Sequence, residues 1–159
     1  MLFKDMEKEK IQILYVDDEI NNLSAFKATF RKLYTVHTAE SAEEGRRLLE
    51  TVPVNIIITD QRMPSITGVE FLESVLKDFP EPIRILITGY ADITAVIDAI
   101  NKGQVYRYIT KPWNEQELIL TINNAYELFS LRKKNKELTE QLLKVNEQLE
   151  FMLRQKLAS

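Results

Sequence analysis

Four short apolar runs each end in a side chain that could take part in phosphate or metal chemistry. Asp17 and Asp18 follow IQILYV, Asp60 follows VNIIIT, Thr88 ends IRILIT, and Lys111 follows VYRYIT. Runs of four to eight apolar or β-branched residues are typical of buried strands, and ligands bind at the carboxyl edge of an open parallel sheet. Three carboxylates at one edge repel one another unless a cation lies among them. The pattern therefore points to a Mg²⁺-dependent phosphate site.

The elements that would position these residues alternate along the chain. Five βα units within about 120 residues predict an α/β fold, a doubly wound five-stranded parallel sheet with right-handed crossovers. Strands are expected at 11–16, 33–39, 54–59, 83–88 and 105–110, and helices at 21–32, after Ser41, at 69–79, at 92–102 and from Asn114 onward.

Several residues have the types expected at element boundaries. Ser41 and Asn114 are each followed three residues later by a glutamate, which is the pattern of a helix N-terminal cap. Gly103 is expected to end the fourth helix. Gly68, in the turn after Asp60, is expected to permit a backbone geometry that a side chain would oppose.

Composition excludes several classes of function. The chain has no cysteine and a net charge of -3, so thiol chemistry is excluded and neither nucleic acid nor an anionic membrane is an expected partner. No apolar stretch approaches the roughly 20 residues that cross a bilayer, and MLFKDMEKEK lacks the apolar core of a signal peptide, so a cytoplasmic location is expected. His37, the single histidine, lies in an alternating strand pattern and is not expected to act in catalysis.

The cluster of acids has two interpretations. Acids at βα turns commonly cap helices, and either Asp17-Asp18 or Asp60 alone would fit that role. Together with Thr88 and Lys111 they fit another chemistry better: a carboxylate beside Mg²⁺ attacks phosphorus, while an ammonium and a hydroxyl stabilise the phosphoryl oxygens.

With these residues in these positions, the sequence resembles the receiver domain of two-component response regulators, the chemotaxis-regulator family. The resemblance lies in VDDE (16–19), IIITDQRMPSITG (56–68), ILITGYAD (85–92) and YRYITKPW (106–113), and it covers roughly residues 10 to 128. It implies a flavodoxin-like fold with strand order 2-1-3-4-5. It also implies a signalling switch that is phosphorylated by a sensor histidine kinase or a phosphotransfer protein, and not a metabolic enzyme.

The family pattern implies a role for each acid. Asp60 would accept the phosphoryl group. Mg²⁺ would be the cofactor, bound directly by Asp18 and Asp60, by Asp17 largely through water, and by the backbone carbonyl of Arg62.

The pattern also implies roles around the phosphoryl group. Lys111 and Thr88 would contact it, Thr88 and Tyr108 would form a switch pair, and the Lys111–Pro112 bond would be cis. Arg62 and Tyr90 would flank the path of the attacking water, and their bulk predicts a long-lived phosphorylated state.

The fifth helix has no stop signal, because no Gly or Pro occurs from residue 115 to residue 159. Apolar residues recur at alternating spacings of three and four, which is typical of a coiled coil. The residues at the a positions of the heptad are Leu128, Asn135, Leu142 and Leu149, and those at the d positions are Leu131, Leu138, Val145 and Met152. Asn135 at an a position favours a parallel homodimer. The alternative is a single amphipathic helix that folds back on its own domain.

The sequence thus predicts an N-terminal lead (1–9), a receiver domain (10–127) and a coiled-coil helix (128–159) continuous with the fifth receiver helix. Phosphorylation would remodel the face made by the fourth helix, fifth strand and fifth helix. Two alternatives stay open: a dimerisation module that does not depend on phosphorylation, and a receiver with its linker from a larger protein with a downstream output domain.

Overall fold

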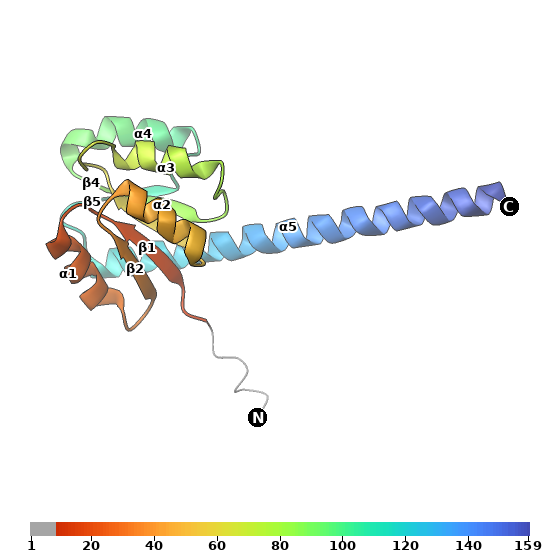
Figure 1. Cartoon of the computed structure of the whole chain (residues 1–159), viewed down its shortest axis with the longest axis horizontal. Coiled ribbons are helices and arrows are strands. Elements are labelled where there is room, and N and C mark those ends of the chain that lie inside the picture. Colours follow the sequence, from red (N-terminus) through yellow and green to blue (C-terminus); the bar gives the residue numbers. More distant parts are fainter. Residues whose placement is uncertain (1–8) are drawn as a thin grey trace, which may run out of the picture.

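The fold is a five-stranded parallel sheet with helices on both faces, followed by a long projecting helix (Figure 1). The structure is a computed structural model that describes residues 9–159, so the expected lead at 1–9 lies outside the described residues except for Glu9. The strand order is β2-β1-β3-β4-β5, as expected. In chain order the elements are β1 (Gln12–Val16), α1 (Ile20–Phe30), β2 (Thr35–Ala39), α2 (Ala42–Thr51), β3 (Ile56–Asp60), α3 (Gly68–Leu76), β4 (Ile83–Thr88), the 3-10 turn η2 (Tyr90–Asp92), α4 (Ile93–Asn101), β5 (Arg107–Thr110) and α5 (Glu115–Ala158).

The central strands are apolar throughout because helices cover both of their faces. Alternate residues of β1, β3 and β4 point to opposite sides and form two separate cores. On one side, Ile58 and its neighbours pack against α1 and α5, with Phe26 at the centre. On the other side, Ile57 and its neighbours pack against α2, α3 and α4, with Phe71 fully enclosed. The sheet is thereby held rigidly enough to fix the positions of the side chains at its edge.

The fifth strand is shorter than the apolar run predicted. The run at 105–110 yields a strand only at Arg107–Thr110, and Arg107 is exposed. The strand is at the edge of the sheet and pairs only with β4. The runs expected at 33–39 and 54–59 likewise begin two residues before β2 and β3. Val105 is still buried, but it packs in the core from the preceding turn.

The expected starts of α2 and α5 are confirmed by their caps, whereas α1 and α3 end at Phe30 and Leu76, two and three residues earlier than expected. The Ser41 hydroxyl accepts a hydrogen bond from the Glu44 amide at 3.2 Å, and the Asn114 side chain accepts one from the Glu117 amide at 3.0 Å. Gly103 has a φ of 74°, which is the left-handed conformation that ends many helices.

Gly68 is required for a different reason from the one the sequence suggested. Its φ is not positive, and the positive φ in this loop, 73°, belongs to Ser65. What Gly68 supplies is space: a Cβ atom there would lie 2.4 Å from the carbonyl oxygen of Asp60 and 2.7 Å from Leu86 Cδ2. The start of α3 therefore presses directly against the backbone of Asp60.

Helix α5 is 44 residues long and belongs to the domain only in its first part. It begins at the carboxyl edge of the sheet, runs back across one face with Leu118, Ile122 and Ala125 buried, and then projects away from the domain (Figure 1). Leu128 still packs against the core, whereas Leu131 is 66% exposed and Leu142 is 61% exposed. Within residues 9–159, no helix combines the length and the apolar character that crossing a membrane requires.

Candidate functional site

The carboxyl edge of the sheet brings the predicted acids together. Asp17 follows β1 directly, and Asp60 is the last residue of the neighbouring strand β3. One carboxylate oxygen from each of Asp17, Asp18 and Asp60 lies within 4.8 Å of the other two. The Lys111 ammonium, which follows β5, lies 2.8 Å from Asp60 Oδ1. The structure therefore places three acids and one cation around a single point.

Asp17 is fully buried and is held by three hydrogen bonds. The Tyr15 hydroxyl donates to its Oδ2 at 2.9 Å, the Asn22 side-chain amide donates to the same oxygen at 3.1 Å, and the Glu19 amide donates to Oδ1 at 3.0 Å. Burial, together with the negative charge of Asp17, strongly raises the pKa of Tyr15, so this phenol stays a donor. The bonds fix the direction of the Asp17 carboxylate while Asp18 beside it remains exposed.

Asp60 is in an environment that disfavours its charge. It is 5% exposed, and burial raises its pKa above the usual 3.8 although the ammonium of Lys111 opposes that shift. The negative charge of Asp17 raises the pKa further. An added cation would relieve both effects. Three carboxylates within reach of one ion are the hard oxygen ligands that Mg²⁺ prefers, so the residues present fit that metal.

The proposed switch residues lie on adjacent strands. Thr88, the last residue of β4, is fully buried and its hydroxyl donates to the carbonyl oxygen of Gly89 at 3.1 Å. Tyr108 on β5 pairs with Leu86, which lies two residues before Thr88 on β4. Its side chain is half-buried against the core on the α3–α4 side. In this arrangement the Thr88 hydroxyl is hydrogen-bonded to the loop that follows β4. The Lys111–Pro112 peptide is cis, as the resemblance implies.

A cavity of about 240 Å³ opens over Asp60. Arg62 and Tyr90 lie at its mouth, and both are mainly exposed; Tyr90 is 76% exposed. Arg62 also pairs with Asp92, with 2.9 Å between Nε and Oδ2. The lining of the cavity therefore includes the Asp60–Lys111 pair and, from the two bordering loops, the Arg62–Asp92 pair.

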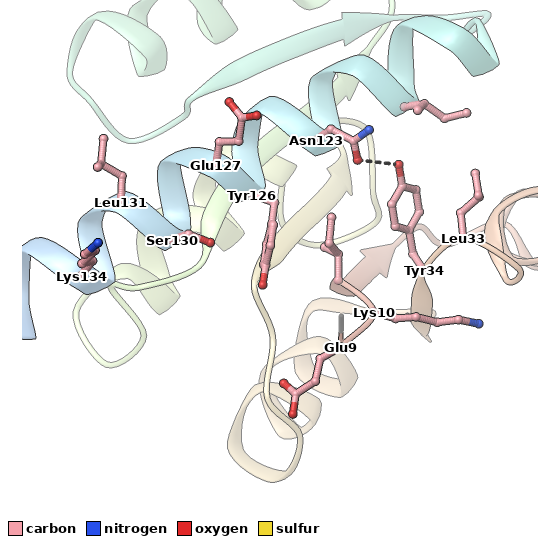
Figure 2. Close-up of a pocket in the computed structure, with 12 residues that line it drawn as sticks. Glu9, Lys10, Leu33, Tyr34, Asn123, Tyr126, Glu127, Ser130, Leu131 and Lys134 are labelled. Atoms are coloured by element: carbon pink, nitrogen blue, oxygen red, sulfur yellow. Dashed lines mark hydrogen bonds between the residues drawn. The ribbon is translucent and has the colours of Figure 1, made fainter. Parts of the chain in front are cut away.

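A larger hollow of about 950 Å³ lies at the opposite, amino edge of the sheet (Figure 2). Figure 2 shows it between α5 and the segment that leads into β2, with the Tyr34 hydroxyl donating to Asn123 Oδ1 at 3.1 Å. Its lining also includes Leu33 and Tyr126. It contains no group of convergent acids, so size alone does not make it the site, and the chemistry favours the smaller cavity.

Sequence reasoning missed three residues that support the site. Asn22 orients Asp17, and Gln61 is buried with its side-chain oxygen accepting from the Val69 amide at the start of α3. Asp92 was expected only as the beginning of a helix. The signal for Gln61 was its place directly after Asp60, but nothing in the spacing indicates that it bonds eight residues ahead.

Comparison with known proteins identifies the family and agrees with the fold. The model of the response regulator receiver domain family matches residues 13–123, and the chain belongs to this family. Proteins of this family are signalling proteins phosphorylated by histidine kinases, and they are not metabolic enzymes.

Among curated proteins, the chain is similar to the hydrogenase transcriptional regulatory protein HoxA of Cupriavidus necator, with 42% identity over 127 residues. That match covers 80% of this chain and 26% of the relative, so the chain spans about a quarter of that protein's length. The HoxA protein of Bradyrhizobium diazoefficiens is 38% identical, with 76% of this chain and 25% of that protein covered.

Among solved structures, the chain is similar to the signal receiver domain of an HD domain-containing protein from Pseudomonas fluorescens, at 31% identity and a TM-score of 0.74. That match covers 80% of this chain and 94% of the solved chain. A receiver domain from Clostridium thermocellum gives 33% identity and a TM-score of 0.72, with 76% of this chain and 98% of the other covered. The family model ends at residue 123, before the projecting part of α5.

Proposed function

We propose that this chain is a phosphoryl-accepting switch in which Asp60 takes a phosphoryl group from a phosphohistidine on a sensor kinase or phosphotransfer protein. One observation carries the proposal. Asp60 is a buried carboxylate at the carboxyl edge of the sheet, 2.8 Å from Lys111 and within 4.8 Å of two further acids. A helix-capping role does not call for a lysine at that distance.

The transfer is a substitution at phosphorus. A carboxylate oxygen of Asp60 forms the new P–O bond, the P–N bond of the phosphohistidine breaks, and its electron pair returns to the imidazole. Lys111 already contacts Oδ1, so the other oxygen is the one that is free to attack. The Lys111 ammonium can then follow the negative charge onto the phosphoryl oxygens.

The acids would hold the metal. We assign Asp17, Asp18, Asp60 and the backbone carbonyl of Arg62 as its protein ligands, with Asp17 acting largely through water. When bound, Mg²⁺ supplies positive charge that offsets the repulsion between the phosphoryl group and the carboxylates. Asn22 and Tyr15 keep Asp17 in the required direction.

The switch would work through Thr88 and Tyr108. The Thr88 hydroxyl now donates to Gly89, and reaching a phosphoryl group on Asp60 requires that bond to break. Movement of Thr88 would open space for Tyr108 to turn inward, which remodels the face formed by α4, β5 and α5. The response is expected in the cytoplasm, where the kinase would act.

The projecting part of α5, residues 128–159, would form a parallel coiled-coil homodimer. From Leu131 to Met152 the apolar stripe is exposed in the single chain, with Leu142 61% exposed. Leu128 packs against its own domain, so the seam open to a second chain begins at Leu131. Asn135 favours an in-register pair, because two facing amides satisfy each other. In this proposal the receiver domain covers residues 10–127 and the helix 128–159 continues from it, with the open seam beginning three residues into that helix.

The test is phosphorylation by acetyl phosphate. With Mg²⁺ present, intact-mass measurement should show one added phosphoryl group, and chelation of the metal should abolish the addition. Asp60→Asn should stay unmodified, whereas Asp78→Asn, which changes an exposed acid far from the site, should react as the unchanged protein does. Equal modification of Asp60→Asn would refute the assignment.

A further inference from the structure

An ion pair joins the two loops that border the cavity over Asp60. Arg62 lies in the loop between β3 and α3, and Asp92 ends the short turn η2 that leads into α4. Arg62 Nε donates to Asp92 Oδ2 at 2.9 Å, and both residues line the cavity. The 30 residues that separate them in sequence make this a contact of the tertiary fold. Any movement of the segment 89–92 must stretch or break it.

The first turn of α4 has no side-chain cap. Asp92 is at the N-cap position of α4, where an aspartate usually accepts a hydrogen bond from an amide two or three residues ahead. Here no side-chain capping bond is formed. Its carboxylate accepts from Arg62 instead, while the carbonyl oxygen of Tyr90 in the preceding turn accepts from the Ile93 amide. No side-chain hydrogen bond reaches the amides of Thr94 and Ala95, so the Asp92 carboxylate would be an additional acceptor for them.

We propose that Arg62 and Asp92 form a clasp that holds the segment 89–92 in its unphosphorylated arrangement, and that phosphorylation converts the clasp into a cap. A phosphoryl group on Asp60 would offer Arg62, two residues away, a strong competing anion. When Arg62 turns to the phosphoryl group, the Asp92 carboxylate becomes free to accept from the first amides of α4. Arg62 and Asp92 are thus positioning residues. The phosphorylation half of this inference rests on the proposed function, whereas the exchange between clasp and cap does not.

The exposure of the pair limits the size of the effect. The Arg62 side chain is 75% exposed and that of Asp92 is 25% exposed, so water and salt screen the attraction. An exposed ion pair changes an equilibrium by at most about fivefold, and a helix cap typically does so by about the same factor. The clasp can therefore bias the loop without locking it, which suits a segment that has to move in every signalling cycle.

The direct test uses unphosphorylated protein and NMR solvent-exchange rates. Arg62→Gln removes the cation and frees Asp92, so the amides of Thr94 or Ala95 should exchange about two- to fivefold more slowly than in the unchanged protein. In Asp92→Ala these amides should gain no protection, and the Arg62 Nε–H should exchange at least about twofold faster. The control is Asp98→Ala, which removes another 2.9 Å ion pair of α4, with Lys102. It should leave the Arg62 Nε–H exchange rate unchanged.

A second arm adds acetyl phosphate and Mg²⁺. In the unchanged protein, phosphorylation should slow amide exchange at Thr94 or Ala95 by the same factor as the Arg62→Gln substitution does. In the Arg62→Gln variant, phosphorylation should slow the exchange of these amides no further. If Arg62→Gln leaves both amides unchanged, or if Asp98→Ala affects Arg62 as Asp92→Ala does, the clasp is refuted. Failure of the protein to take up a phosphoryl group would refute the proposed function instead, because the first arm needs no phosphorylation.

Discussion

Replacing Gly68 by alanine tests how tightly the start of α3 is fitted against Asp60. The added Cβ would lie 2.4 Å from the Asp60 carbonyl oxygen, 2.7 Å from Leu86 Cδ2 and 3.1 Å from the Asp60 carbonyl carbon. Favourable contacts between carbon atoms lie at about 3.5–4.0 Å, so the overlap approaches an ångström. The oxygen belongs to the backbone of a central strand and cannot rotate away. The hydrogen bond from the Gly68 amide to the Gln61 carbonyl, 2.9 Å long, must shift as well.

Overpacking of this kind costs about 1–3 kcal/mol, from which the higher helix propensity of alanine subtracts less than about 1 kcal/mol. We expect Gly68→Ala to lose about 1–2 kcal/mol of unfolding free energy. The matched control is Gly89→Ala. A Cβ there meets nothing within 4 Å, and the φ of −84° suits alanine, so this variant should be neutral or more stable by up to about 1 kcal/mol.

Urea unfolding at one fixed protein concentration measures both variants. The single tryptophan, Trp113, packs with Phe26 and Phe30 and gives a fluorescence signal that comes from the core. With an unfolding slope of about 2 kcal/mol per molar urea, the Gly68→Ala midpoint should fall by about 0.5–1 M. Equal midpoints for the two variants would show that α3 can move away from Asp60 at no cost, and the close fit described here would be wrong.

Four further predictions follow from other contacts. Burial, and secondarily the charge of Lys27, lower the pKa of His37, so an NMR titration should give a pKa below 6.5 that rises in Lys27→Gln. Because folding lowers this pKa, His37 should reduce the stability of the protein only as the pH falls below about 6.5. A measured pKa above 6.5 would contradict this. Arg84→Met should destabilise the protein by about 2–4 kcal/mol in urea unfolding, because the buried guanidinium donates to three backbone carbonyl oxygens, and a loss below about 0.5 kcal/mol would count against those bonds. Tyr15→Phe removes one of three donors to Asp17, so Mg²⁺ affinity measured by calorimetry should fall severalfold, and unchanged affinity would remove this phenol from the site. Asn135→Leu should tighten self-association in sedimentation equilibrium, and the number of chains in the oligomer should become less well defined. If both the unchanged protein and this variant stay monomeric, the coiled coil is excluded.

The sheet and its edge could be predicted from sequence because each signal was local. An apolar run of five or six residues predicts a buried strand, and parallel strands place the residues that follow them at one edge, so the meeting of Asp17, Asp60 and Lys111 followed from topology alone. The expected start of β5 was wrong by two residues because Val105 is buried although strand pairing begins only at Arg107.

Contacts between loops could not be predicted in the same way. The role of Gly68 depends on how close α3 comes to Asp60, a distance set by the whole packing of the sheet. The pairing of Arg62 with Asp92 depends on where two loops end in space, and either residue alone is an ordinary exposed charge in the sequence. Spacing along the chain carries no information on such distances.

Chemical location of the acyl phosphate distinguishes Asp60 from every other aspartate as the acceptor. Protein treated with acetyl phosphate and Mg²⁺ is reduced with borohydride, which converts a phosphorylated aspartate to homoserine, and the product is sequenced by tandem mass spectrometry. We expect homoserine at position 60 and at no other aspartate, with its yield falling to background when the metal is chelated. Homoserine at position 17 or 18, or its absence from a protein that carries an added phosphoryl group, would contradict the assignment of Asp60 as the acceptor.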